Sequence, residues 1–245
     1  MTLLKPILYF SLFKYPLTEE EIFNFSKATS KEQIKLDLNE LVNDNIIYKI
    51  DDFYLTENNE TLIKRRLEGN KMAKNIYQKA LTISRLISKF PYVEGVGISG
   101  SLSKGYYDDD ADIDFFIITS PKRLWIARTF LILYKKIFLL NSKKYFCVNY
   151  FISSNALEIE EKNIFTATEL TTLLPMFGNG SFHKFYDENK WVENYLPNKT
   201  VTDGLSKLHV VKKPTTTKIT EYFLDSRIGD WLDAAFLRIT YKKWK

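Results

Sequence analysis

The sequence predicts an α+β fold with a small sheet flanked in the chain by helical segments. Apolar residues recur at helical spacing through much of 4–43 and again through 61–89. Two short apolar runs, 93–99 and 115–118, have the length and composition of buried strands. A last helical stripe covers 219–239. We therefore expect four parts: an N-terminal domain at 1–60, a connecting helix at 61–90, a sheet-containing core at 91–155 and a mainly helical region at 156–245.

The composition is that of an ordinary globular protein. A chain of 245 residues with 45% hydrophobic content can bury one sizeable core, or one core and a small satellite domain. A charged fraction of 27% with only 9 Gly and 7 Pro argues against a disordered or fibrous chain. Cys147 is the single cysteine. We expect no internal disulfide and a reducing, cytoplasmic location.

Two apolar stretches, 3–13 and 124–140, do not fit membrane segments. The first is short and is followed by no small-residue cleavage site. The second carries Arg128, Lys135 and Lys136, which a bilayer-spanning helix rarely tolerates. We expect both to be core helices, and we expect no membrane partner.

The first sixty residues predict three helices and a short hairpin. Thr18 with Glu21, and Ser30 with Gln33, fit the capping box, in which each side chain satisfies a backbone donor near the other. Two strand-like runs follow, on either side of residues 51–52. This outline resembles a winged helix over about sixty residues.

The charge of this segment bears on its role. Residues 1–60 carry 6 basic and 11 acidic side chains. In a DNA-binding winged helix the third helix presents cations to phosphates. The third helix here carries both signs, with acids at Glu32, Asp37, Glu40 and Asp44 beside Lys31 and Lys35. We favour a role in protein contacts or in positioning the neighbouring domain, with nucleic-acid binding as the alternative.

The connecting helix at 61–90 is strongly basic. Its 8 Lys and Arg residues face a single acid, Glu68. One interpretation is a solvated face. The other is a collar that attracts a triphosphate or a nucleic acid.

The pattern that carries chemistry begins where the first strand-like run ends, at Gly100-Ser101. An acidic loop follows, and Asp112-Ile113-Asp114 then opens the second apolar run. On an extended strand, residues i and i+2 project to the same face. We therefore expect Asp112 and Asp114 to lie side by side, with Ile113 turned into the core.

These residue types suit the binding of a metal ion and phosphate. Two carboxylates on one face repel each other unless a cation lies between them, and Mg²⁺, or Mn²⁺ in its place, favours carboxylate and phosphate oxygens. Gly100 lets the backbone approach closely, and Ser101 offers a hydroxyl and an N–H to a phosphate. Lys104 lies one helical turn further along, where its ammonium can reach the same phosphates.

The Gly-Ser turn, ten intervening residues and Asp-x-Asp before an apolar strand resemble the polymerase-beta-type nucleotidyltransferase superfamily. The order of strand, turn, helix and strand extends the resemblance over 91–152. The resemblance implies a small mixed-sheet core with appended helices, triphosphate binding by Gly100 and Ser101, and metal binding by Asp112 and Asp114. A preceding winged-helix segment is also similar to uncharacterised bacterial nucleotidyltransferase-like proteins, for which it implies no substrate.

The predicted function is Mg²⁺-dependent transfer of a nucleoside monophosphate from a nucleoside triphosphate to a hydroxyl group. The acceptor stays open between a small molecule, a protein and RNA. Nucleic acid could also bind through the basic helix at 61–90.

Superfamily members usually place a third carboxylate on the next core strand, which we expect at 145–152. That run contains no acid, and Asn149 occupies the plausible position. An amide oxygen can ligate Mg²⁺ but cannot accept a proton. Glu158, Glu160 and Glu169 follow, as substitutes for the base or as surface charges. The alternative function is therefore a weak or inactive nucleotidyltransferase-fold protein that acts as a nucleic-acid- or protein-binding regulator.

The remaining features carry less chemistry. We expect a helix at 166–174, a loop-rich stretch to Pro214, and one final helix at 219–239 whose aromatic residues form core or an oligomer contact. Arg128 either pairs with a phosphate or extends from an apolar helix to solvent. Cys147 is expected to pack in the core. Two histidines and one cysteine give no pattern of a zinc cluster or a hydrolase triad.

Overall fold

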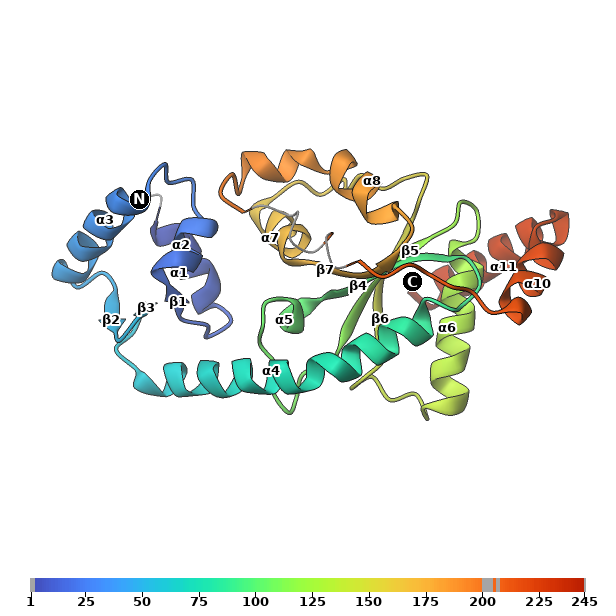
Figure 1. Cartoon of the computed structure of the whole chain (residues 1–245), viewed down its shortest axis with the longest axis horizontal. Helices are drawn as coiled ribbons and strands as arrows, with labels where there is room; N and C mark the ends of the chain where they lie inside the picture. The colour runs from blue at the N-terminus through green and yellow to red at the C-terminus, as the bar shows by residue number, and fades with distance from the viewer. Residues whose placement is uncertain (1–2, 200–204, 206–207, 245) are drawn as a thin grey trace.

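The structure is a computed structural model that describes residues 3–199, 205 and 208–244 (Figure 1). The N-terminal helices lie at one end of the molecule, and the helices α10 (Thr215–Leu224) and α11 (Arg227–Trp244) lie at the other. A four-stranded sheet lies between them. The long helix α4 (Glu60–Ile87) runs from the N-terminal segment to this sheet.

The N-terminal segment, residues 3–55, has its own core. Its three-stranded antiparallel sheet has the order β1-β3-β2. Ile22, Ile34 and Leu38 are almost fully buried against this sheet, in a cluster with Leu17. The elements are α1 (Leu4–Ser11), β1 (Leu17–Thr18), α2 (Glu19–Asn24), α3 (Lys31–Asn43), β2 (Tyr48–Ile50) and β3 (Phe53–Leu55).

The two expected capping boxes differ in the structure. At α2 the box is complete, because Thr18 accepts from the Glu21 backbone N–H and the Glu21 carboxylate accepts from the Thr18 N–H. At α3 the Ser30 hydroxyl oxygen accepts from the Gln33 N–H, as expected. The Gln33 side chain, however, donates to Asp37 at 2.6 Å. The prediction that the Gln33 side chain accepts from the Ser30 backbone N–H is therefore wrong.

The central sheet is mixed, with the order β6-β5-β4-β7. Strand β4 (Val93–Ser99) pairs antiparallel with β5 (Asp114–Thr119) and with β7 (Leu174–Gly178). Strand β6 (Cys147–Ser153) pairs parallel with β5. A parallel pair needs a crossover, and α6 (Leu124–Phe138) supplies it.

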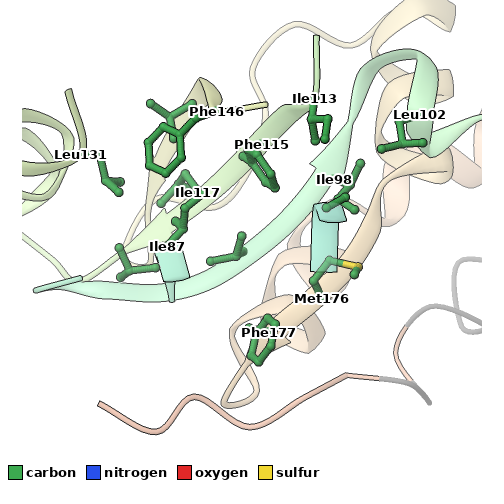
Figure 2. Close-up of a cluster of buried hydrophobic side chains, with 14 of the residues drawn as sticks. Ile87, Ile98, Leu102, Ile113, Phe115, Ile117, Leu131, Phe146, Met176 and Phe177 are labelled. Carbon is green, nitrogen blue, oxygen red and sulfur yellow. The ribbon is translucent and has the colours of Figure 1, made fainter. Parts of the chain in front are cut away.

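Helices cover both faces of this sheet. Phe115 and Ile117 of β5 face the layer of α4 and α6, where Ile87 and Leu131 pack against them (Figure 2). Phe116, the residue between them, faces the opposite layer. That layer is formed by α7 (Ile164–Thr172) and α8 (Ser181–Glu188), followed by a short 3₁₀ helix, η1 (Lys190–Asn194). Both faces are buried, which explains the continuous apolar run of β5.

Strand β7 was not expected from the sequence. The predicted helix at 166–174 ends earlier, at Thr172, and Pro175 lies inside the strand. Proline lacks a backbone N–H, so strands that contain it lie at sheet edges or at bulges. Strand β7 is the outer strand beside β4, and its pairing shifts register at Val96/Gly97.

The expected final helix is two helices, α10 (Thr215–Leu224) and α11 (Arg227–Trp244). The chain leaves the helical conformation at Asp225. A Cβ at Gly229 would lie 1.7 Å from the Leu224 carbonyl oxygen, so the glycine permits the close approach of the two helices. Phe236 packs with the core of α6, whereas Trp231 is 67% exposed.

Within the described ranges, none of the helices combines the length and the apolar character that crossing a membrane requires.

Candidate functional site

The Gly-Ser turn directly follows β4 and forms the start of the short helix α5 (Gly100–Ser103). Gly100 has a φ of +68°, and a Cβ at this position would lie 2.5 Å from an oxygen of the Asp114 carboxylate. A side chain is excluded both by the backbone conformation and by this contact. The Gly100 carbonyl oxygen accepts from the Ser103 hydroxyl at 2.8 Å. The turn and Asp114 are therefore packed directly together.

Asp114 is the first residue of β5 and pairs with Ser99 at the end of β4. Asp112 precedes the strand, but Ile113 continues the pairing because its N–H donates to the Lys144 carbonyl oxygen. Ile113 is fully buried, and both aspartates are half-buried. This is the alternation expected of an extended segment.

The electrostatic environment of Asp114 shows that charged groups converge here. Burial raises the pKa of Asp114, and the negative charges of Asp112 and Glu169 raise it further. A hydrogen bond from the Cys147 thiol and the positive charge of Lys104 act in the opposite direction. A partly buried carboxylate held beside two other negative charges is a favourable place for a cation.

Cys147, rather than Asn149, is the residue paired with Asp114 across β5 and β6. Its thiol interacts with that carboxylate. Burial and this interaction raise the pKa of Cys147 to about 12. The pairing shifts register after Val148, and Asn149 is exposed on the outer strand, where it lines a cleft.

Lys104 and Glu169 form an ion pair that joins the turn to α7. The Lys104 ammonium lies 2.7 Å from a Glu169 carboxylate oxygen and also donates to the Gly100 carbonyl oxygen at 3.1 Å. Both side chains are largely buried, with 17% and 27% of their surface exposed. Glu169 therefore lies at the site and is not a remote surface charge, whereas Glu158 and Glu160 are exposed.

A cleft of about 820 Å³ opens beside the Gly-Ser turn. One side is formed by the turn itself, with Gly100 and Ser101, and by Asn149. The other side comes from α7 and from the N-terminal segment, which contributes three aromatic residues. These are Phe10, Phe13 and Tyr15.

Polar contacts hold the N-terminal segment against the site. The Tyr15 hydroxyl donates to the Lys104 carbonyl oxygen at 3.4 Å, and Asn70 of α4 donates to the Gly105 carbonyl oxygen at 2.6 Å. The ring of Tyr9 lies 6.5 Å from that of Phe165 on α7. No short motif in the sequence indicates these contacts, because they join segments more than thirty residues apart.

The basic helix α4 is only partly a solvated face. Arg66 is buried and makes a bidentate pair with Glu21 at 2.8 Å. Arg65 lies 3.3 Å from Asp108. The Lys79 ammonium lies 3.1 Å from the centre of the Tyr145 ring. Of these three cations only Arg66 is buried, whereas Arg65 and Lys79 are exposed.

Arg128 contacts Thr240 of α11 at 3.5 Å, at the contact between α6 and α11.

Among the residues that the structure describes, no three or more His, Cys, Asp or Glu side chains form a group able to hold a metal ion.

Comparison with known proteins supports one family. Residues 81–171 match the family model of the nucleotidyltransferase domain. Searches of curated proteins and of solved structures gave no match. The matched range contains the Gly-Ser turn, both aspartates and α7 up to Thr171, and it supports nucleotidyl transfer as the general function. Over residues 81–171 the chain is therefore similar to the nucleotidyltransferase domain, consistent with the polymerase-beta-type superfamily that the motif resembles.

Proposed function

We propose that the protein is a Mg²⁺-dependent enzyme that transfers a nucleoside monophosphate from a nucleoside triphosphate to a hydroxyl acceptor and releases pyrophosphate. The contact between the Gly100 turn and the Asp114 carboxylate carries this proposal. This contact places the Gly100 backbone, which a phosphate can approach closely, next to the Asp114 carboxylate, which can bind a cation. Phosphoryl-transfer sites need these two functions side by side.

In this proposal the turn binds the triphosphate. Gly100 exposes its backbone, and the Ser101 side chain lines the cleft. Lys104 can contribute as well. An ammonium has three protons, of which two are used here by the Gly100 carbonyl oxygen and by Glu169, so one remains for a phosphate oxygen.

Asp112 and Asp114 fit a divalent cation. They are half-buried carboxylates whose mutual repulsion a cation would relieve. Asn149 is a weaker candidate ligand because it is exposed on the outer strand and is not the partner of Asp114. Mg²⁺ bound by the aspartates would neutralise charge that develops on the transferred phosphate.

We assign the general base to Glu169. Neither Asn149 nor the Cys147 thiol is a suitable proton acceptor, because an amide is not basic and the pKa of this thiol is raised to about 12. Glu169 lines the cleft, and its charge acts on Asp114. Its pairing with Lys104 fixes its position beside the turn.

We infer that the N-terminal segment is a winged helix that positions one wall of this cleft. Its element order of helix, strand, two helices and two strands supports this assignment, as does the sheet order β1-β3-β2. The aromatic residues that it places in the cleft favour substrate contact over DNA binding by α3.

The test is a transfer assay with each labelled nucleoside triphosphate, Mg²⁺, and separate small-molecule, protein and RNA fractions as acceptors. We expect Mg²⁺-dependent transfer that falls about 1,000-fold in Asp112→Asn and in Asp114→Asn, because such variants lose the carboxylates that stabilise transition-state charge. The matched control is Asp110→Asn, an exposed aspartate two residues before Asp112, which should keep activity. Transfer that survives both site variants contradicts the proposal.

A further inference from the structure

The lining of the cleft carries a marked excess of negative charge. Glu158, Glu160 and Glu161 line it from the segment between β6 and α7, and Glu169 lines it from α7. Of the lining residues that the structure describes, Lys104 is the single cation. One ammonium against four carboxylates leaves three negative charges in excess.

Two of the four glutamates, Glu160 and Glu161, form no ion pair with a cation among the described residues, so their negative charge acts on the cleft. Glu169 is paired with Lys104, and Glu158 is paired with Lys162 at 2.6 Å. Glu160 has no ion pair among the described residues, and Glu161 accepts only a neutral hydrogen bond, from Asn163. Burial raises the pKa of the Tyr150 phenol, and the charges of Glu160 and Glu161 raise it further. Both acids therefore act on a residue inside the cleft.

The same cleft exposes aromatic surface. Phe13 from the N-terminal segment and Phe165 from α7 are each 52% exposed, and both line the cleft. Tyr150 is 46% exposed, and its ring stacks on Phe116 at 5.2 Å. Aromatic rings open to water favour a ligand that covers them, and their faces attract cations as well as apolar groups.

We propose that this cleft binds, as the acceptor, a compact hydroxyl compound that carries a positive charge on an apolar body. The inference rests on the proposed function, which left the acceptor open. The cleft of about 820 Å³ includes the turn proposed to bind the triphosphate, so only part of it is left for a compact acceptor. A nucleic acid would bring a continuous line of phosphates against the excess carboxylates, whereas the known binders of its backbone present cations. The excess negative charge of the lining and its exposed aromatic residues together favour an organic cation.

Three probes that share a 4-hydroxyphenyl ring on a two-carbon chain, and differ in the group at the end of the chain, test the charge requirement. Tyramine is cationic, tyrosol is neutral, and 3-(4-hydroxyphenyl)propionate is anionic. Their dissociation constants are measured by calorimetry on the full chain, without nucleotide and in EDTA. We expect tyramine to bind about fivefold more tightly than tyrosol, and the propionate to bind most weakly, because each exposed ion pair contributes modestly. The preference should shrink at high salt.

Variants locate the effect. Glu160→Gln and Glu161→Gln should each reduce tyramine affinity about threefold and leave tyrosol affinity unchanged. Glu40→Gln, which removes an exposed acid on α3 outside the cleft lining, should change neither. Equal affinities for the three probes, or displacement of tyramine by single-stranded oligouridine, would overturn the inference.

A transfer assay with the same probes and labelled triphosphates separates this inference from the proposed function. Charge-selective binding with no transfer to any acceptor contradicts the proposed enzyme but supports the ligand class of the cleft. Transfer to RNA, together with equal affinities for the three probes, supports the proposed enzyme but overturns the proposal that the acceptor is an organic cation.

Discussion

The two sides of the cleft differ in how they are built. The side proposed to bind the triphosphate is lined by residues between Ser99 and Tyr106, next to the end of β5 that carries Asp114. The opposite side combines Phe10 and Phe13 of the N-terminal segment with Phe165 and Glu169 of α7, more than 150 residues later in the chain. Backbone pairing fixes the first side. Side-chain contacts fix the second.

This difference suggests a division of labour. Strand pairing holds Asp114 against Gly100 without help from distant segments, which suits chemistry that needs fixed geometry. The second side is held by the Lys104–Glu169 pair and by the Arg66–Glu21 pair. Its exposed aromatic residues can be substituted without disturbing the strands, and this independence suits recognition of the acceptor.

Glu169 tests whether the second side also takes part in chemistry. Glu169→Gln should lower the rate constant of transfer about 100-fold or more, because a neutral amide cannot accept the proton. Triphosphate binding should stay within about twofold. The control is Glu158→Gln, in the same cleft but exposed and paired with Lys162. Equal losses of transfer in the two variants would remove Glu169 from this role.

The Arg66–Glu21 pair tests how the second side is held in place. The Arg66 side chain is 7% exposed, so Glu21→Gln leaves a buried cation without its counter-charge and should destabilise the protein by about 3 kcal/mol. Glu20→Gln removes a 3.8 Å pair with Lys31 at the surface and should cost less than about 0.5 kcal/mol. Urea unfolding measures both. Similar values for the two variants would show that the buried pair is not what fixes this segment.

Gly100 tests the strand-borne side. Gly100→Ala and Gly105→Ala both place a side chain at positive φ, +68° and +74°, which costs about 1 kcal/mol in each. Only Gly100→Ala also puts a Cβ 2.5 Å from the Asp114 carboxylate, whereas at Gly105 the nearest atom, on Asn70, is 4.0 Å away. We expect about 2 kcal/mol of destabilisation and at least tenfold slower transfer for Gly100→Ala, and near-normal transfer for Gly105→Ala. Thermal unfolding and the transfer assay measure the two effects. Equal transfer rates in the two variants would show that the close contact between Gly100 and Asp114 does not affect activity.

Much of the element order followed from local patterns. The apolar runs of β4 and β5 and the helical periodicity of α4 appear in the structure within a few residues of the expected bounds. Strand β7 could not be predicted this way. Its five residues contain Pro175, and only pairing with β4 makes them a strand. The break between α10 and α11 was also missed, because an apolar stripe continues across it.

The sequence by itself determined the Gly-Ser turn, the two aspartates and the strands that carry them, because these residues are close in the chain and obey the two-residue period of a strand. Only the tertiary structure decided that Cys147 pairs with Asp114, that Glu169 reaches the turn, and that aromatic residues of the N-terminal segment line the cleft. A register shift at Val148 and the packing of segments far apart in the chain produce these contacts, and neither leaves a periodic signal in the sequence.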